Sequence, residues 1–277
     1  MSDQQKYTTK LAGKRVLVIG GSSGMYMSFY WKACLTLRIK GIGFCVAEAS
    51  VEQGADVIIS SSNPSRIEEA VKKLQQAYPS KKDKITGHAC GLGDEATLEK
   101  NVEELYTSAT SNGSKKLDHI IFTAGDALAV LKLQDADMTK IKQAGMVRFF
   151  APLIVAKHAV KHLNAGPASS IILTTGSVSE RPRPDWSIIG SFATGLHGMT
   201  RSLALDLAPI RVNLISPGGV ETELWNGLPE DKRKAMFKEM GESVPTGTIG
   251  KPEHVAESYI VSEIVCVYKG QYREANL

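Results

Sequence analysis

The sequence predicts a single α/β domain over residues 1–277, with a doubly wound parallel sheet and helices on both of its faces. Short aliphatic runs recur along the chain and alternate with stretches of helical periodicity, which is the pattern of a parallel sheet. A glycine- and serine-rich turn follows the first run, as is typical of a strand that leads into a ligand-binding helix. In such a fold, ligands bind at the carboxyl ends of the strands.

The predicted elements follow from the positions of the aliphatic runs and of the turn residues between them. Strands are expected at residues 15–19, 55–60, 85–90, 117–123, 170–175 and 210–215. Helices are expected at residues 44–53, 64–77, 95–112 and 188–207, the third of them with Asp94 as its N-cap, and residues 127–163 are expected to be mostly helical. No internal repeat or low-complexity linker divides the chain, so we predict one domain.

The composition argues against several classes of function. The net charge of +4 is small and no basic cluster is interleaved with aromatic residues, so nucleic-acid binding is not expected. The four cysteines are far apart, which indicates a reducing compartment and not a disulfide framework or a zinc site. The N-terminus is polar, and the apolar residues 25–39 include Lys32 and Arg38 and are too short to span a bilayer. We therefore expect a cytoplasmic protein with no membrane partner.

Two histidines have a spacing that can hold zinc. His158 and His162 are four residues apart on a predicted helix. The sequence HAVKH lacks the glutamate of the H-E-x-x-H motif, and the neighbouring lysines indicate a solvated face. We predict no metal site.

The turn after the first strand has the pattern of a phosphate-binding loop, but it is interrupted. The sequence KRVLVIGGSSG ends at Gly24, and the continuation GIG begins at Gly41. Reading across residues 25–41 gives one uninterrupted strand, glycine turn, helix and second strand. Glycines at these positions let backbone N–H groups approach a pyrophosphate at the start of a helix.

Motifs along the chain resemble, in order, those of the short-chain dehydrogenase/reductase family. They are GGSSG with GIG, FTAG at 122–125, the serine of LTTGS at Ser177, GLHGMTRSLALDLAPIRVNLISPG at 195–218, VET at 220–222 and GKPEHVA at 250–256. The second half is similar to fungal reductases of secondary-metabolite clusters, including an indole-alkaloid branch in which a degenerate reductase can also promote a cycloaddition. The resemblance covers nearly the whole chain. It implies a Rossmann-type fold, an oxidoreductase with a small-molecule substrate, and a homodimer or homotetramer.

The resemblance also implies a nicotinamide cofactor, and we predict NADP(H). In the family an Asp or Glu at the end of the second strand binds the 2′-hydroxyl of NAD, but SSSNPSR contains no acid. Arg66 offers forked donors that suit a 2′-phosphate. The alternative is that Ser-Asn-Pro is only a turn into a helix. The predicted cofactor-binding residues are Gly20, Ser22, Ser23, Gly24, Ile42, Gly43, Ser61, Ser62, Asn63, Arg66, Ala124, Gly125, Pro217, Gly218, Val220 and Thr222.

Most of the family's catalytic pattern is absent. Members use a Ser, a Tyr and a Lys four residues later, with an Asn on the preceding helix, and the Tyr supplies the proton. Here only Ser177 remains, and the other positions hold Ile189, Ala193 and Arg148. Because an iminium ion already carries the positive charge that a hydride neutralises, we predict hydride transfer to an activated carbonyl or imine-like acceptor. The alternatives are a non-redox, cyclisation-assisting protein and an inactive relative.

A loop with the sequence ERPRPDW follows Ser177, where substrate is expected. We predict that the catalytic residues are Ser177, Arg148, Asp185 and Trp186. Trp186 would stack on an aromatic substrate, Arg148 would bind an anion or carbonyl oxygen, and Asp185 would pair with a cation. In the alkaloid branch the Asp lies two residues earlier, where this chain has Arg183. The alternatives are a loop anchor for Trp186 and a surface salt bridge for Arg148.

Two segments depart from the family pattern, residues 25–41 and residues 261–277, and the second replaces the strand that should complete the sheet. Both begin with residues that a splice donor can encode, so our hypothesis is that both are untranslated genomic sequence read as protein. If both are translated, we expect poor dinucleotide affinity, because the N–H groups of the turn cannot converge on the phosphates. The alternative for residues 25–41 is a lid over the pocket.

Overall fold

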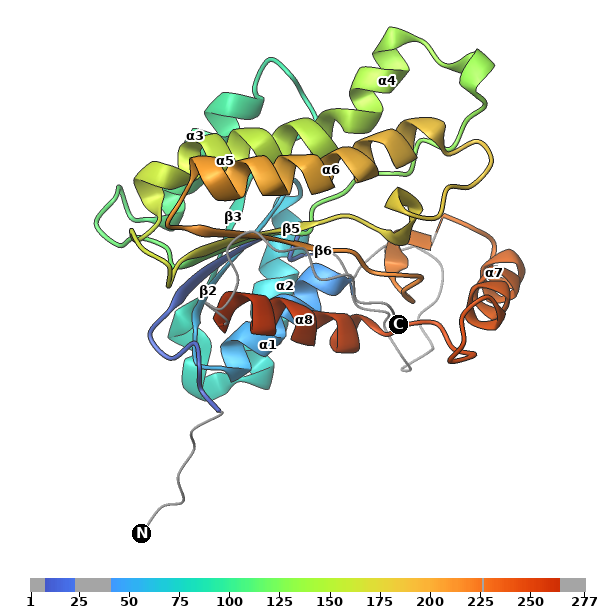
Figure 1. The fold of residues 1–277 in the computed structure, drawn as a ribbon. Coiled ribbons are helices and arrows are strands. Elements are labelled where there is room, and N and C mark those ends of the chain that lie inside the picture. Colours follow the sequence, from blue (N-terminus) through green and yellow to red (C-terminus); the bar gives the residue numbers. More distant parts are fainter. Residues whose placement is uncertain (1–7, 23–40, 226, 265–277) are drawn as a thin grey trace.

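A six-stranded parallel sheet forms the centre of the computed structural model, which describes residues 8–22, 41–225 and 227–264 (Figure 1). The strands are β1 (Arg15–Ile19), β2 (Asp56–Ser61), β3 (Ile85–Ala89), β4 (His119–Phe122), β5 (Ser170–Thr174) and β6 (Arg211–Ile215). Their order in the sheet is β3-β2-β1-β4-β5-β6, so the direction of winding reverses between β1 and β4. The predicted doubly wound sheet is confirmed.

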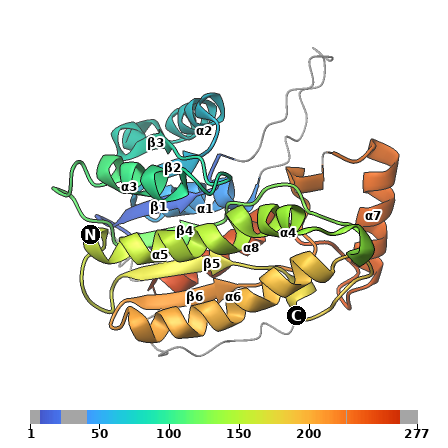
Figure 2. The same cartoon turned by 90° about the horizontal axis from the view of Figure 1, so that it is seen from above.

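Helices cover both faces of the sheet (Figures 1 and 2). One face carries α3 (Leu98–Ala109), α5 (Ala151–His162) and α6 (Ser187–Asp206). The other face carries α1 (Ile42–Glu52), α2 (Pro64–Ala77) and α8 (Pro252–Ile264). Two further helices, α4 (Met138–Gly145) and α7 (Glu230–Glu242), lie toward one end of the sheet. Among the described helices, none combines the length and the apolar character that crossing a bilayer requires.

The central strand β1 is buried on both sides because it is aliphatic at successive positions from Val16 to Ile19. Along β1, Val16 and Val18 belong to the core beneath α1, α2 and α8, whereas Leu17 and Ile19 belong to the core beneath α3, α5 and α6. None of these four side chains is accessible to solvent. Side chains alternate between the two faces of a strand, so a strand covered on both faces needs apolar residues throughout.

The predicted N-terminus of the third helix is wrong. The structure begins α3 at Leu98, with Thr97 at the N-cap position. The Asp94 carboxylate instead accepts hydrogen bonds from the Ala96 backbone N–H at 3.1 Å and from the Thr97 hydroxyl at 3.0 Å. Asp94 therefore stabilises the turn before the helix, a role that competes with helix capping for short polar side chains.

Residues 127–163 are mostly helical, as predicted, but the helical part starts late and is interrupted. The chain forms no helix over residues 124–132, and α4 begins after Asp137, whose carboxylate accepts a 2.8 Å hydrogen bond from the Lys140 N–H. A π-helical turn, Met146–Phe150, then separates α4 from α5. Pro152 explains this interruption, since proline has no N–H to donate to the carbonyl four residues earlier.

The described chain ends without the last strand that completes the sheet in the family it resembles. No strand follows β6 within the described residues, and residues 265–277 of the atypical tail lie outside them. In α8, Glu263 is only 2% exposed, and both its carboxylate oxygens are buried without a hydrogen-bond partner in the described part of the chain. Burial raises the pKa of Glu263 well above its usual value. A buried, unpaired carboxyl group costs free energy in the folded protein.

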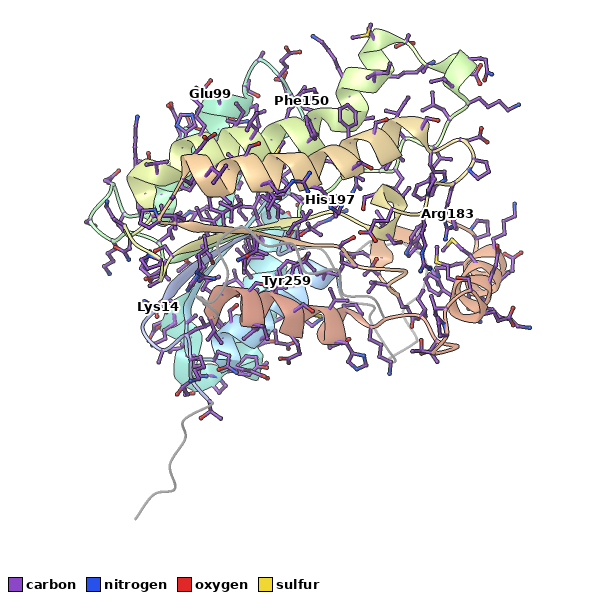
Figure 3. The ribbon with its side chains drawn as sticks, in the orientation of Figure 1. Lys14, Glu99, Phe150, Arg183, His197 and Tyr259 are labelled. Carbon is purple, nitrogen blue, oxygen red and sulfur yellow. The ribbon has the colours of Figure 1, made fainter. Side chains whose placement is uncertain are left out.

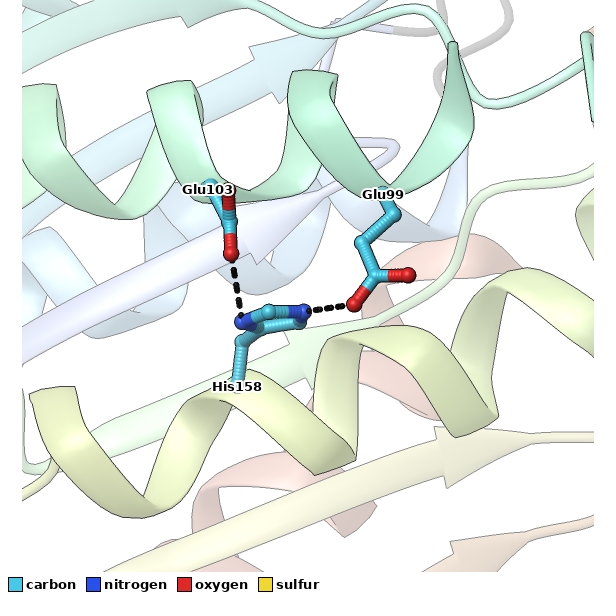
Figure 4. A group of neighbouring side chains, drawn as sticks. All are labelled: Glu99, Glu103 and His158. Carbon is cyan, nitrogen blue, oxygen red and sulfur yellow. Dashed lines mark hydrogen bonds and ion pairs between the residues drawn. The ribbon is translucent and has the colours of Figure 1, made fainter. Parts of the chain in front are cut away.

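His158 connects α3 to α5, and the predicted solvated face is wrong for this residue. Its side chain is 7% exposed and lies between two glutamates (Figure 4). Its Nε2 is 2.9 Å from Glu99, and its Nδ1 is 3.5 Å from Glu103. The two carboxylates face different ring nitrogens, and Lys157 also pairs with Glu99, so this arrangement fits an ion-pair link between helices better than a metal site.

Replacing His158 with alanine is expected to lower the free energy of unfolding by about 1–3 kcal/mol. The change removes a nearly buried ring and both of its contacts to α3. Lys157→Ala serves as the control, because it removes an exposed partner of the same Glu99 and should cost less than about 1 kcal/mol. Urea unfolding measures both values. Equal losses in the two variants would contradict a special role for His158.

Candidate active site

A cavity of about 870 Å³ opens at the carboxyl ends of the strands, next to the point where the winding of the sheet reverses. The structure brings nearly all of the predicted site residues to its wall: Gly20, Ser22, Ile42, Gly43, Ser61, Ser62, Asn63, Arg66, Ala124, Gly125, Arg148, Ser177, Trp186, Pro217, Gly218, Val220 and Thr222. Ser23 and Gly24 lie outside the described residues. Loops after parallel strands converge at one edge of a sheet, which explains why residues so far apart in sequence meet here.

Two glycines allow the backbone segments at the first strand to approach each other closely. A Cβ atom on Gly20 would lie 2.5 Å from the Ala124 nitrogen, and Gly20 has a φ of +99°. A Cβ atom on Gly43 would lie 2.5 Å from the Gly20 carbonyl oxygen and 2.4 Å from the Thr123 hydroxyl. Any larger residue at either position would push β1, α1 and the chain after β4 apart.

The end of β2 presents hydroxyl, amide and guanidinium groups to the cavity. The Ser22 and Ser61 hydroxyls are 2.6 Å apart, and the Asn63 N–H donates to the Ser61 hydroxyl over 3.3 Å. The Asn63 side chain accepts a 3.2 Å hydrogen bond from the Arg66 N–H and caps α2. The turn that the sequence suggested as an alternative is therefore present, and the same residues line the cavity.

The turn that carries Ser177 is held in place by α6. It is a short 3₁₀ helix, Ser177–Ser179, and the Ser177 N–H donates to the Pro217 carbonyl over 3.0 Å. The Ser179 hydroxyl lies 2.9 Å from Nε2 of His197 (Figure 3), and the Thr194 hydroxyl donates to the Ser179 carbonyl over 2.9 Å. Ser177 thus faces the cavity from a turn anchored at both sides.

The positions expected for a catalytic tyrosine and lysine face the cavity but carry no proton donor. Ile189 and Ala193 are one turn apart on α6 and both line the cavity. The Ala193 carbonyl accepts a 2.8 Å hydrogen bond from the Thr175 hydroxyl, which fixes this part of α6 against the end of β5. No tyrosine, lysine or histidine lines the cavity in the described part of the chain.

Arg148 pairs with an aspartate that the sequence analysis missed. Its Nε lies 3.2 Å from a carboxylate oxygen of Asp126, and its Nη2 donates to the Asp126 carbonyl. Burial lowers the Arg148 pKa, and the Asp126 charge opposes this shift. A Cβ atom on Gly125 would lie 2.7 Å from Nη1, so the guanidinium packs directly on the backbone. The salt bridge that the sequence analysis kept as the alternative is present, in the cavity wall and not on the outer surface. It leaves less of the Arg148 charge for a substrate.

The loop before α6 contributes Arg183 and Trp186 to the cavity, but not Asp185. The Arg183 guanidinium carbon lies 5.9 Å from the centre of the Trp186 ring, within the range of a cation–π contact. Asp185 is exposed, does not line the cavity and has a φ of +64°. The predicted position of Asp185 in the site is therefore wrong. Its carbonyl accepts a hydrogen bond from the Leu131 N–H, which ties the two loops together.

Several other lining residues gave no sequence signal. The aromatic ring of Phe192 lines the cavity and contacts Phe149 at 5.2 Å between ring centres. After β6, a 3₁₀ turn (Glu223–Trp225) closes over the cavity, and the Trp225 indole N–H donates to the Val220 carbonyl over 3.1 Å. Glu223 directly follows the VET motif, and this neighbouring position could have identified it as a residue of the cavity wall.

Comparisons with known proteins agree with this geometry. The family description "SDR-like rossmann domain" matches residues 7–265. The short-chain dehydrogenase/reductase fsr5 of Gibberella fujikuroi is 44% identical over 265 residues, which cover 94% of this chain and 92% of fsr5. The short-chain dehydrogenase/reductase malC of Malbranchea aurantiaca is 35% identical over 263 residues, with 94% and 92% covered.

A solved structure of a related protein shows the same similarity. The structure described as MalC Reductase/Diels-Alderase from Malbranchea aurantiaca has a TM-score of 0.83 and 34% sequence identity, and the alignment covers 95% of this chain and 94% of that one. The resemblance to fungal members of the family is confirmed. From this family match, its fold and its cavity, we conclude that the chain belongs to the short-chain dehydrogenase/reductase family of nicotinamide-dependent oxidoreductases, which act on small molecules.

Proposed function

We propose that this protein is an NADP(H)-dependent reductase of an activated, imine-like acceptor in fungal secondary metabolism, with an indole-alkaloid intermediate as a candidate substrate. One observation carries the proposal. The cavity has a glycine-lined nucleotide end, while Ile189 and Ala193 stand where the family places its proton donor. A reaction that needs hydride but no enzyme-supplied proton fits both facts.

The residues at the end of β2 support NADP(H) over NAD(H). Ser61, Ser62 and Asn63 offer hydroxyl and amide donors, and no Asp or Glu among them would repel a phosphate. Arg66 lines the cavity at the start of α2, where its guanidinium would meet a 2′-phosphate. Gly20 and Gly43 let the end of β1 and the start of α1 pack closely together. The start of α1 lines the cavity, where a pyrophosphate could bind at the helix N-terminus.

When bound, the nicotinamide supplies the hydride, and the protein supplies binding and the exclusion of water. Ile189, Phe192 and Ala193 form an apolar wall on α6, and Trp186 offers a flat surface for a polycyclic aromatic substrate. An iminium carbon accepts hydride to give a neutral amine, so no proton is required at Ile189. Ser177 remains to donate a hydrogen bond to a polar group of the substrate.

The test compares two acceptors in the presence of the full-length protein. NADPH absorbance is followed with a cyclic iminium compound and with a ketone of matched shape. We expect NADPH consumption with the iminium compound and little with the ketone, and slower consumption of NADH. If neither the full-length protein nor the chain without residues 25–41 binds or consumes either nucleotide, the proposed function is wrong.

A second function is favoured by a specific observation. The related MalC structure is described as both a reductase and a Diels-Alderase, and the cavity here lacks a proton donor at Ile189 and Ala193. Such a pocket could orient a diene and dienophile without redox chemistry. Cyclised product without loss of NADPH in the same assay would support this function, and no product of either kind would indicate an inactive relative.

The assembly and location of the protein stay predictions. A groove between α5 and α6 is lined by Leu153, Ile154, Leu203 and Leu207, and Leu153 is 45% exposed. We propose that this face joins two copies, in agreement with the predicted homodimer or homotetramer. Cytoplasmic location remains an expectation from the sequence.

A further inference from the structure

A carboxyl group at the nucleotide end of the cavity has no part in the chemistry proposed above. Glu223 directly follows Thr222 and lines the cavity together with Asn63 and Arg66. Its Oε1 atom is buried and has no hydrogen-bond partner among the described residues. A carboxyl group left in this state costs free energy, so its presence in a ligand cavity needs an explanation.

The loop that carries Glu223 is fixed to the body of the protein. The Glu221 N–H donates to the Gly250 carbonyl over 2.9 Å, and Val220 forms a parallel bridge with Gly250. The Trp225 indole N–H donates back to the Val220 carbonyl over 3.1 Å. Glu223 is therefore held near the cavity by its own loop and does not depend on a ligand for its position.

The charged groups that act on Glu223, within the part of the chain described, both come from α2. They are Arg66 and Lys73, which are seven residues apart and so lie on the same face of the helix. The α7 residue that lines the cavity is the uncharged Met240. The remaining charged residues of the cavity wall come from other elements: Asp126, Arg148 and Arg183.

Burial raises the pKa of Glu223 to about 7, and the two cations oppose this shift. The carboxyl group is therefore mainly neutral below neutral pH and mainly ionised above it. In the ionised form it cancels part of the positive potential that Arg66 and Lys73 present to an anion. In the neutral form it leaves that potential intact.

We propose that Glu223 is a specificity-determining residue for the nucleotide, and that its ionised carboxylate weakens the binding of a ribose 2′-phosphate at Arg66. The inference rests on the proposed function, in which Arg66 receives that phosphate. NAD(H) lacks the 2′-phosphate, so the charge of Glu223 affects its binding much less. Ionisation of Glu223 therefore lowers the preference for NADP(H) over NAD(H) as pH rises through neutrality.

The test measures dissociation constants of NADPH and NADH for the full-length chain by calorimetric titration, from about pH 6 to about pH 8.5, on either side of the Glu223 transition. Three proteins are compared: wild type, Glu223→Gln, and Glu221→Gln as a matched control two residues away that does not line the cavity. The ionisation of the 2′-phosphate itself is common to all three and cancels in the comparison.

At the alkaline end, Glu223→Gln is expected to bind NADPH about tenfold more tightly than wild type, because the change removes a negative charge from the cavity that would hold the phosphate. At the acid end the two should agree, and Glu221→Gln should follow wild type throughout. NADPH binding that is equal in wild type and Glu223→Gln at every pH would overturn the inference while leaving the proposed function intact. So would an equal effect on NADH.

Two further results complete the test. Should Glu223→Gln not fold, Glu223→Ala takes its place against wild type, and equal NADPH binding by these two proteins at every pH would overturn the inference. If neither wild type nor the chain without residues 25–41 binds either nucleotide at any pH, the proposed function fails first and the inference fails with it.

Discussion

Excision of residues 25–41 is expected to tighten the binding of NADPH by at least tenfold relative to the full-length chain. The excised sequence would join GGSSG directly to IGF and restore the short glycine turn of the family. In that turn several backbone N–H groups point at the pyrophosphate from the start of a helix. One charge-assisted hydrogen bond gained is worth about 1.5–3 kcal/mol, and about 1.4 kcal/mol already corresponds to a factor of ten.

The packing on either side of the excised segment supports this expectation. Gly43 is in contact with the Gly20 carbonyl, and Gly20 is in contact with the backbone at Ala124. The end of β1 and the start of α1 are thus already positioned against each other, and a short connection is sufficient to join them. The excision should therefore leave the sheet and its cavity unchanged.

A matched variant separates the length of the insertion from its sequence. Replacing residues 25–41 with a Gly/Ser linker of the same length should leave NADPH binding as weak as in the full-length chain. Calorimetric titration of the three proteins measures the effect, and near-equal affinity of the excised and full-length chains would contradict the prediction. Sequencing the spliced transcript independently tests whether residues 25–41 and 261–277 are translated.

The sheet could be predicted from sequence because most of its strands are marked by local runs of apolar residues. Strands such as β1 and β4 are buried on both faces, so they consist mainly of consecutive apolar residues and stand out from amphipathic helices. The motifs also located the cavity, because they follow directly after strands whose carboxyl ends meet at one edge. The order of the strands within the sheet was not predicted and comes from the structure.

The sequence predictions failed for residues whose role depends on partners that are far away in the sequence. The role of Arg148 was predicted without knowledge of its partner Asp126. A loop and helix α4 separate the two residues in the sequence, and they come into contact only in the folded chain. The burial of His158 depends on α3, which lies far away in sequence. Periodicity carries no information about such pairs. The same holds for Glu223, whose environment comes from Arg66 and Lys73 on α2.

Restoring the missing proton donor is expected to create a ketone reductase. In the double variant Ile189→Tyr/Ala193→Lys, the two new side chains lie one turn apart on α6, facing the cavity and Ser177. The lysine would lower the tyrosine pKa, and the tyrosine would protonate the oxyanion formed on hydride transfer. A positioned general acid contributes about 10²–10⁴-fold, so ketone reduction should rise by about 10²-fold or more. Reduction of the iminium compound needs no proton and should change by less than about threefold for the same reason.

The control is Ile189→Phe/Ala193→Lys, which has nearly the same bulk but lacks the phenolic hydroxyl. Ile189 is 7% exposed, so a large ring will disturb the packing of α6 to a similar extent in both variants. Rates of NADPH consumption with the matched ketone distinguish them. A gain seen only with tyrosine, and lost as pH rises through the new phenol pKa, would identify proton supply as the missing element. If the phenylalanine variant gains as much, the barrier to ketone reduction lies in the shape of the pocket and the proposed reason for the iminium preference is wrong.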